Sequence, residues 1–397
     1  MRQDFEKIDY LVGDQDILKS IGQVPSLQIF DKTVVSFLSR LSEVLLHDTQ
    51  AKKFGDVEAL AFWIRRASIE RYANQYQSAS RIGWGTAFHI TPSNIPVQFA
   101  VSLIYALTAG NASVVRLSNK NFEQTDIICK ALNDVLHDGF ENLIPYICVI
   151  RYDHNDEITS AITQLSDIRM IWGGDQTISS IRNIQMPPRS LDLGFADRFS
   201  IAVIDSDYYL GHDPKYVARD FYLDTYYTDQ NACSSTRIVL WTGTSIEKAK
   251  EQFWNRLHKE VDDHYQLNDI SGSEKLLKTA ECAENHPGIR ENRIDNSLVR
   301  VEIPKIYDDI MDYKGNSGYF FECNLNSFDE LTKIITKECQ TITYYGDGLY
   351  DAIKDVVVCN GLKGGDRIVP LGHSMDLSFV WDGMDMPYAL SRIVSNR

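Results

Sequence analysis

The sequence predicts an α/β protein with two parallel-sheet domains behind a helical N-terminal segment. A chain of 397 residues is longer than a typical single hydrophobic core, so two domains are expected. Strand-like and helix-like patterns alternate from residue 81 onward, which is typical of parallel sheets covered by helices. The alternation resumes after Cys233, which indicates a second sheet.

Composition limits the classes of function. Apolar residues make up 44% of the chain and charged residues 24%, as in ordinary globular proteins. A formal net charge of −15 argues against a nucleic-acid binder, because neutralising phosphates requires a basic surface. No apolar run approaches the roughly 18 residues of a membrane span, and residues 1–6 show no signal-peptide pattern. We therefore expect a cytoplasmic protein without a membrane span.

The cysteines predict neither disulfides nor a metal site. There are seven, at positions 129, 148, 233, 282, 323, 339 and 359. Their number is odd, and no CxxC or Cys/His spacing occurs among them. Neither a disulfide framework nor a zinc site is expected.

Residues 1–80 are predicted to be a mostly helical lead-in. Apolar residues recur at helical spacing over 36–46 and again over 57–72. No catalytic grouping is present there, so we expect this segment to pack on the domain that follows.

The alternating pattern divides the rest of the chain. We expect a cofactor-binding domain over 81–207, a catalytic domain over 208–365, and a C-terminal segment over 366–397 that returns to the cofactor domain. The boundary is placed near Asp207. The patterns that support this division are strands at 85–90, 113–117, 146–151, 168–172, 200–205 and 237–241, helices at 97–107, 121–136 and 245–261, and later elements at 331–339, 341–345 and 356–359.

The segment around Asn94 joins a predicted strand to an apolar helix. Pro96 suits the first turn of a helix, which places Asn94 at or next to the helix N-terminus. The Asn94 side chain could cap that helix, or its amide could donate to a developing oxyanion. His89 lies inside the strand and is interpreted as a core histidine rather than a base.

Two further segments could bind a nucleotide. The strand ending in Arg116 is followed by Asn119 and Lys120, which could hold ribose and phosphate at the carboxyl edge of a sheet. A solvated basic loop is the alternative. The strand ending in Trp172 leads into Gly173 and Gly174 and then a helix, where glycines allow close approach to backbone. A glycine pair alone is weak evidence.

Cys233 is the candidate nucleophile. It lies among small and polar residues and is followed by an apolar β-branched run at 238–240. Small neighbours let a carbonyl approach the thiol, and backbone N–H groups at such a turn can stabilise an oxyanion. A buried structural cysteine is the alternative.

In this order, the motifs resemble the aldehyde dehydrogenase superfamily. From about residue 80 to the C-terminus, the sequence is similar to the bacterial long-chain fatty acyl-CoA reductases of the bioluminescence (LuxC-like) type. The superfamily motifs are Pro92-Ser93-Asn94-Ile95-Pro96, Gly110-Asn111 to Arg116, Trp172-Gly173-Gly174, Leu191-Asp192-Leu193-Gly194 and Gln230-Asn231-Ala232-Cys233. The segments shared with the LuxC-like reductases are Phe88-His89-Ile90-Thr91-Pro92-Ser93-Asn94-Ile95-Pro96, Ile171-Trp172-Gly173-Gly174-Asp175, Asp229-Gln230-Asn231-Ala232-Cys233-Ser234-Ser235, and Asp366-Arg367-Ile368-Val369-Pro370-Leu371-Gly372 through Trp381-Asp382-Gly383.

The resemblance implies an aldehyde-dehydrogenase-like fold of two Rossmann-like domains. It implies Cys233 as the nucleophile, with the Asn94 amide and the Cys233 backbone N–H as oxyanion donors. Arg116, Asn119, Lys120 and the Trp172-Gly173-Gly174 segment would bind the cofactor. The implied reaction reduces a long-chain acyl-CoA, or another acyl thioester, to an aldehyde through an acyl-cysteine.

Three departures from the superfamily pattern matter. Asn119 stands where a carboxylate grips the ribose hydroxyls of NAD, so with Arg116 and Lys120 nearby we expect NADPH as the cofactor. The glutamate that activates hydrolytic water is replaced by the shorter Asp192, which leaves Asp192 as a possible catalytic residue. No Glu-x-Phe-Gly-Pro motif follows Cys233, so the carboxylate for the nicotinamide ribose is not located.

Two alternative functions stay open. An aldehyde dehydrogenase could oxidise an aldehyde to the acid, although Asp192 supports water activation less well than a glutamate. A non-catalytic acyl-binding protein could keep the fold, although Cys233 and Asn94 are both present. A homo-oligomer is also expected, and a partner enzyme that transfers the acyl group is a further candidate.

Overall fold

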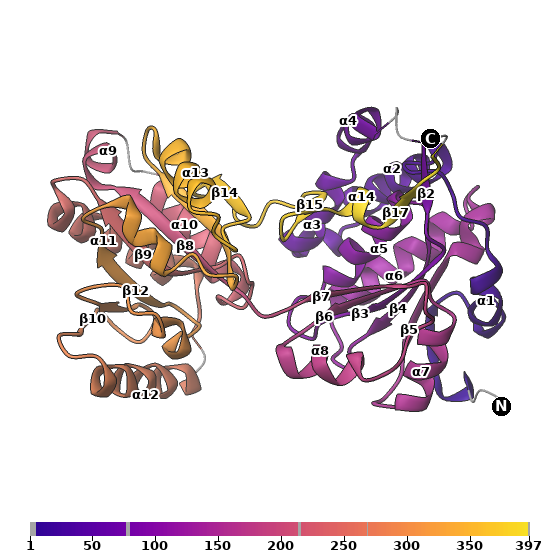
Figure 1. The fold of residues 1–397 in the computed structure, drawn as a ribbon, viewed down its shortest axis with the longest axis horizontal. Coiled ribbons are helices and arrows are strands. Elements are labelled where there is room, and N and C mark those ends of the chain that lie inside the picture. Colours follow the sequence, from indigo (N-terminus) through magenta and orange to yellow (C-terminus); the bar gives the residue numbers. More distant parts are fainter. Residues whose placement is uncertain (1–4, 77–79, 213–215, 268, 396–397) are drawn as a thin grey trace. The chain divides into compact units, whose positions relative to one another are not determined.

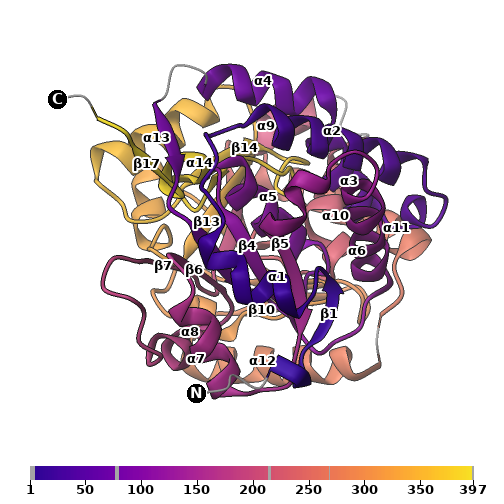
Figure 2. The same ribbon diagram turned by 90° about the vertical axis from the view of Figure 1, so that its right-hand side faces the viewer.

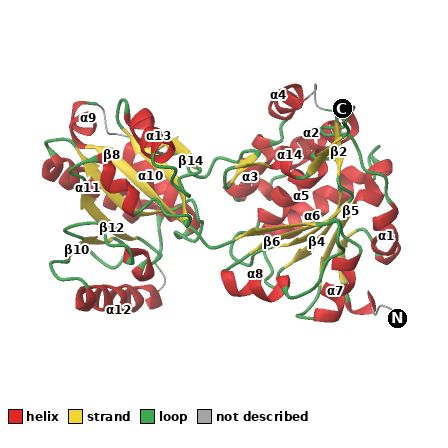
Figure 3. Cartoon of the chain, in the orientation of Figure 1, coloured by secondary structure: helices red, strands yellow, loops and turns green. Residues whose placement is uncertain are grey.

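A computed structural model describes residues 5–76, 80–212, 216–267 and 269–395 of the chain. The chain forms two compact units, Met1–Ala196 with Leu377–Arg397, and Asp197–Asp376. In each unit the strands gather into one main sheet with helices on both sides (Figure 3). Residues 1–4 of the segment that lacks a signal-peptide pattern lie outside the described residues.

The first unit contains a six-stranded sheet in which only the first edge strand is antiparallel. The strands at its centre are buried on both faces, as expected where helices cover both sides. In spatial order the strands are β1 (Asp9–Val12), β5 (Ile147–Arg151), β4 (Ala112–Leu117), β3 (Thr86–Ile90), β6 (Ile168–Trp172) and β7 (Leu191–Phe195).

Helices cover both faces of this sheet (Figures 1 and 2). On one face lie α5 (Gln98–Thr108) and α6 (Glu123–Leu136), with α2 (Lys32–His47) packed on both. On the other lie α7 (Asp156–Gln164) and α8 (Asp175–Arg182). The remaining N-terminal helices are α1 (Gln15–Ser20), α3 (Gly55–Trp63) and α4 (Arg66–Tyr76).

The C-terminal residues complete the first unit. The Tyr105 hydroxyl of α5 donates to the Ser378 carbonyl (2.8 Å), and the Asn111 amide donates to the Leu390 carbonyl (2.8 Å). These bonds tie the returning chain to α5 and to the start of β4. The elements here are β2 (Arg81–Gly83), which pairs with β17 (Ser391–Ile393), the pair β15 (Val380–Trp381) and β16 (Met384–Asp385), and α14 (Met386–Ala389).

The second unit is built on a seven-stranded sheet with one antiparallel edge pair, β10 with β11. In spatial order its strands are β10 (Arg290–Arg293), β11 (Val299–Glu302), β12 (Tyr319–Asn324), β9 (Thr236–Thr242), β8 (Phe199–Asp205), β13 (Cys339–Tyr345) and β14 (Arg367–Pro370). Its helices are α9 (Ser206–Gly211), α10 (Val217–Thr225), α11 (Ile246–His264), α12 (Asp269–Asn285) and α13 (Leu349–Cys359).

Side-chain alternation divides the core of the second unit into two layers. Along β8, Ile201 and Val203 pack with residues of α13, whereas Ala202 and Ile204 pack with residues of α10 and α11. Successive strand residues point to opposite faces, so a strand buried on both sides feeds both layers.

The α/β alternation predicted from the sequence is confirmed, but the predicted domain limits need correction. The first unit ends at Ala196 rather than near Asp207, because β8 pairs with β9 and β13 and so belongs to the second sheet. The chain returns at Leu377 rather than at 366, because β14 pairs with β13. The lead-in is helical except for β1, which pairs with β5 and makes the segment part of the first unit.

Candidate active site

Cys233 lies on a loop between the 3₁₀ turn Tyr226–Thr228 and β9. Asp229 and Gln230, which precede it, both have left-handed backbone, with φ of 52° and 54°. Non-glycine residues rarely hold this conformation unless the surroundings enforce it, and such positions gather at functional sites. Cys233 itself is half-buried, between the buried residues Ala232 and Ser234.

The Gln230 side chain fixes the loop from inside. It is fully buried, and its amide nitrogen donates to the carbonyls of Thr236 and Tyr319, at 3.1 Å each. Its amide oxygen accepts from the backbone N–H of Gly318 (2.7 Å) and of Tyr319 (3.0 Å). With four hydrogen bonds the amide group is fully satisfied, and it ties the loop to the start of β12.

Arg237 fixes the same loop with a charge. Its guanidinium is buried and donates to the carbonyls of Gly315 and Gln230 and to Asn316 Oδ1 (2.6 Å). Burial lowers the pKa of Arg237 to about 10, and the charge of Cys233 opposes this shift. A buried cation therefore lies within electrostatic range of the thiol.

The backbone of Cys233 is also held. Ser200 Oγ in β8 donates to the Cys233 carbonyl at 2.7 Å. The next residue, Ser234, places its hydroxyl 3.2 Å from the sulfur of Met375. The segment that carries Met375 is in turn bound by the buried Asp224, which accepts the N–H groups of Gly372 (2.6 Å) and Ser374 (3.0 Å).

The other cysteines lie in different environments. Cys359 is exposed on α13, and the remaining five are buried. Burial raises their thiol pKa values, to about 12 for Cys129, Cys148 and Cys339 and to about 11 for Cys282 and Cys323. Buried thiols of this kind are inert. Cys233 thus combines partial access with a nearby cation.

Asn94 lies in the connection between β3 and α5 and is exposed. Helix α5 begins at Gln98, and its N-cap is Val97, without a side-chain cap. Asn94 therefore lies four positions before the first helical residue and outside the N-cap position of α5. His89 in β3 is confirmed as a core residue: it is fully buried, and desolvation lowers its pKa to about 3.

Arg116 lies at the carboxyl end of β4, where the sequence places a cofactor residue. Its guanidinium lies over the ring of Tyr152 at 4.5 Å and donates to the Tyr152 carbonyl at 3.5 Å. The Tyr152 hydroxyl contacts Thr159 of α7 at 3.0 Å, so Arg116 faces the α7 side of the sheet. Its buried Nε has no hydrogen-bond partner.

Asn119 and Lys120 both follow β4, but their side chains contact different residues. The Asn119 amide donates to Asp153 Oδ1 at 2.8 Å, beyond the end of β5. Lys120 is exposed, with its ammonium 5.0 Å from the ring of Phe122, and it lines a hollow that does not include Arg116. The structure therefore does not bring Arg116 and Lys120 to one point, and it places a carboxylate beside Asn119.

The Trp172-Gly173-Gly174 segment joins β6 to α8. Trp172 is buried, stacks on Phe195 at 3.9 Å and donates to Ser102 Oγ (2.9 Å), so its ring serves the core. Gly174 is the N-cap of α8, and a Cβ placed there would meet nothing within 4 Å. The packing of the unit does not require glycine at 174, which leaves room there for a ligand.

Asp192 in β7 is engaged by two arginines. Arg169 donates to its Oδ2, with an Nε distance of 3.0 Å, and Arg182 Nε lies 3.1 Å from its Oδ1. Guanidinium donors therefore occupy both carboxylate oxygens of Asp192. The geometry therefore disfavours Asp192 as the base that activates water.

The proposed site residues are thus divided between the units. Cys233 belongs to the second unit, and Asn94, Arg116, Asn119, Lys120, Trp172, Gly173, Gly174 and Asp192 belong to the first. Sequence reasoning missed Arg237 and Asp153. The signal for Arg237 was an arginine at the start of an apolar strand, whereas Asp153 follows β5 and only the fold brings it to Asn119.

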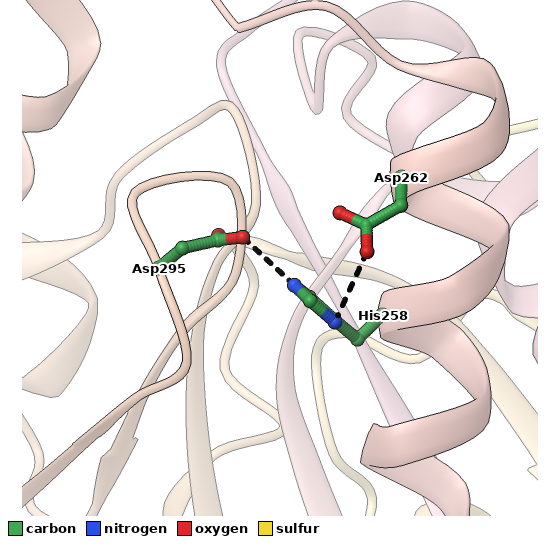
Figure 4. Close-up of side chains that lie close together, drawn as sticks. All are labelled: His258, Asp262 and Asp295. Carbon is green, nitrogen blue, oxygen red and sulfur yellow. Dashed lines mark hydrogen bonds and ion pairs between the residues drawn. The ribbon is translucent and has the colours of Figure 1, made fainter.

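One cluster of potential metal ligands occurs in the described part of the chain, His258, Asp262 and Asp295 (Figure 4). His258 Nε2 lies 2.8 Å from Asp295 and Nδ1 lies 3.4 Å from Asp262. Burial raises the pKa of Asp295, but hydrogen bonds from His258 and Ser297 outweigh it and lower that pKa to about 2. Because each carboxylate faces a different ring nitrogen, His258 bridges the two carboxylates, and we assign no cation site there.

The structure has the aldehyde dehydrogenase fold. It matches a lactaldehyde dehydrogenase with a TM-score of 0.62 at 11% identity, over 89% of this chain and 81% of that one. It matches an NAD-dependent benzaldehyde dehydrogenase from Corynebacterium glutamicum with a TM-score of 0.63 at 11% identity, over 95% and 94% of the two chains.

The chain belongs to the acyl-CoA reductase (LuxC) family, whose model matches residues 9–267. It is similar to long-chain acyl-protein thioester reductase 2 of Photobacterium leiognathi, 24% identical over 62% of this chain and 49% of that protein. It is also 24% identical to the long-chain acyl-protein thioester reductase of Vibrio harveyi, over 72% and 58%. The matched region thus spans about half the length of these relatives. Among the described helices, none is long and apolar enough to cross a membrane.

Proposed function

We propose that this chain reduces a long-chain fatty acyl-CoA, or another acyl thioester, to the fatty aldehyde with NADPH through an acyl-cysteine on Cys233. The observation that carries the proposal is the half-buried Cys233 on a loop that the buried side chains of Gln230 and Arg237 hold by hydrogen bonds. Membership of the acyl-CoA reductase family supports the substrate class. The relatives' own name, acyl-protein thioester reductase, is the reason to include thioesters other than CoA.

The first half-reaction would transfer the acyl group to the protein. The Arg237 charge favours the thiolate of Cys233, which is the nucleophilic form. The new S–C bond forms at the thioester carbonyl, and the carrier's C–S bond breaks as its thiolate leaves and takes a proton from solvent. Asn94 and the Cys233 backbone N–H are the proposed donors to the oxyanion between these steps.

The second half-reaction would use a nicotinamide cofactor, which supplies the hydride that takes the acyl group to the aldehyde level. Two features of the first unit fit such a group: the open position at Gly174 on the N-terminus of α8, and the unpartnered Nε of Arg116. Arg116, Asn119, Trp172, Gly173 and Gly174 are the residues proposed to hold it, and Lys120 was predicted with them. The NAD-dependent benzaldehyde dehydrogenase of the same fold supports a nicotinamide cofactor here.

The preference for NADPH rests on Arg116 and on the amide at Asn119. Asp153 opposes it, because its carboxylate lies 2.8 Å from the Asn119 amide and would repel a 2′-phosphate. The balance between these groups sets the ratio of the two cofactors. A cytoplasmic location, a homo-oligomer and an acyl-transferring partner enzyme remain predictions.

Aldehyde oxidation to the acid is the less favoured activity. It needs a base to activate water, and Asp192 is occupied by Arg169 and Arg182. The same occupation would slow hydrolysis of an acyl-cysteine, which suits a reductase. A non-catalytic acyl-binding role does not explain why the Cys233 loop holds two left-handed residues in place.

Intact-protein mass spectrometry tests the acyl-cysteine. Incubation with palmitoyl-CoA and no reductant should add one acyl mass to the wild type and none to Cys233→Ala. Cys359→Ala is the matched control, since Cys359 is the exposed thiol elsewhere in the same unit. This control should acylate like the wild type. An adduct of equal yield on Cys233→Ala would contradict the assignment.

A further inference from the structure

A hollow in the first unit is not accounted for by the proposed cofactor residues. It lies at the carboxyl ends of β3, β4 and β5 and is open to solvent. Its polar lining residues are Thr91, Ser118, Lys120, Thr125 and Arg151, and no carboxylate lines it. Two cations and three hydroxyls around one hollow favour an anion.

Among the residues that line the hollow, Arg151 has buried donors without a partner. Its Nε and one terminal nitrogen are buried and have no hydrogen-bond partner. Leaving buried donors unsatisfied costs about 1–3 kcal/mol, and more for a charged group, so such groups are rare without a reason. A guanidinium also presents two parallel N–H groups that match a phosphate.

The hollow lies on the face of the sheet opposite Arg116. In the β4–β5 pair, Arg116 is opposite Ile150, and Leu117 is opposite Arg151. Successive residues point to opposite faces, so Leu117 and Arg151 share one face and Arg116 takes the other. Phe99 of α5 and Thr125 of α6 also line the hollow, which places it on the α5/α6 side, whereas Arg116 faces α7.

We propose that Arg151 and Lys120 bind a phosphate group of the thioester substrate's carrier arm, either CoA or protein-bound phosphopantetheine. This inference rests on the proposed function. Ile95 and Pro96, which flank the Asn94 loop, form one wall of the hollow, so a ligand bound there lies beside the proposed oxyanion donor. The cofactor's adenosine would lie on the opposite face of the sheet, beside Arg116. The anion expected beside Arg151 and Lys120 would therefore come from the substrate.

Isothermal titration of CoA, with no turnover, tests the site. Arg151→Gln should weaken CoA binding about tenfold or more, the loss expected for a charge-assisted contact. It should leave NADPH binding within about twofold of the wild type. Arg116→Gln is the matched control: it should weaken NADPH binding and leave CoA binding within about twofold of the wild type. Arg151→Lys should restore part of the CoA affinity, and the melting temperature of each variant shows that it is folded.

Two shorter ligands identify which phosphate binds. If Arg151 reads the 3′-phosphate of CoA, dephospho-CoA should bind the wild type as weakly as CoA binds Arg151→Gln. If it reads the phosphate next to pantetheine, 4′-phosphopantetheine should still depend on Arg151. CoA binding unchanged by Arg151→Gln, or a loss confined to NADPH, would overturn the assignment.

The acylation assay separates the two proposals. If the wild type is acylated at Cys233 but Arg151→Gln leaves CoA affinity unchanged, the proposed function stands and the phosphate site is refuted. Failure of the wild type to form any adduct would refute the proposed function itself.

Discussion

Residues 229–237 and residues 91–97 each carry one residue of the proposed chemistry, and they are held in different ways. Around Cys233, the buried side chains of Gln230 and Arg237 make seven hydrogen bonds, four from one and three from the other. Around Asn94, the described bonds include Thr91 to the Arg116 carbonyl (2.9 Å) and a backbone turn from Gln98 to Ile95 (3.3 Å).

This difference follows from what each loop must do. A nucleophile has to meet a carbonyl at a fixed angle, so its backbone is set by buried groups, including two left-handed residues. An amide donor on an exposed loop needs less support, and its substitution should affect chemistry more than folding. The two loops therefore predict opposite responses to mutation.

The largest effect on stability is expected from Arg237→Met. The change leaves the carbonyls of Gln230 and Gly315 without their donor inside the protein. The free energy of unfolding should fall by about 3 kcal/mol or more, measured by urea denaturation. Arg116→Met, which loses one 3.5 Å bond and a stacking contact, is the control and should cost about 1 kcal/mol. Equal costs would mean that the Cys233 loop is not specially fixed.

Asn94→Ala should lower turnover about 10²–10³-fold, as expected for loss of an oxyanion donor. Its loss of stability should be smaller than that of a capping variant, because Val97 rather than Asn94 is the N-cap of α5. Asn155→Ala is the matched control: Asn155 caps α7 through the Ile158 N–H at 3.0 Å. That variant should lose about 1 kcal/mol of stability and keep its turnover. The same pattern in Asn94→Ala would refute the oxyanion role.

Sequence reasoning succeeded where a local pattern decides the structure. The apolar run predicted as a strand at 85–90 is β3, and the Cys233 loop followed by a β-branched run is the loop before β9. Sequence reasoning failed where the pairing between strands decides which sheet a strand belongs to. β8 has the same buried composition as the strands before it, and only its pairing with β9 assigns it to the second sheet. β1 has four residues at a sheet edge and lacks a strong pattern.

The candidate site shows the same limit. Cys233 and Asn94 stand in motifs, so the sequence alone identifies them as candidates. The facing of Arg116 and Arg151 depends on the register of β4 against β5, and a sequence without pairing information cannot separate the two arginines. Asp153 lies 34 positions from Asn119, and only the fold brings its carboxylate to the amide.

The support of the nucleophile loop should also depend on pH through Asp224. Burial raises the pKa of Asp224 to about 6, although the N–H groups of Gly372 and Ser374 oppose the shift. The folded protein then binds this proton more tightly than the unfolded chain, so stability falls as pH rises between about 4 and 6. The contribution amounts to at most about 3 kcal/mol. The free energy of unfolding of the wild type, relative to that of Asp224→Asn, should fall by up to that amount from pH 4 to pH 7. A difference between the two proteins that is the same at both pH values would refute the prediction.

The smallest effect is expected at the exposed end of the first unit, where Asp153 faces Asn119. Asp153→Asn removes a carboxylate 2.8 Å from the Asn119 amide and should raise the NADPH-to-NADH ratio of kcat/KM about tenfold. Asn119→Glu adds a carboxylate at the same place and should lower the ratio. Asp156→Asn is the control, because it removes the same charge three residues away in the first turn of α7. Steady-state kinetics with both cofactors measure all three variants. If Asp156→Asn shifts the ratio as much as Asp153→Asn, the effect is one of general charge, and Asp153 does not select the cofactor.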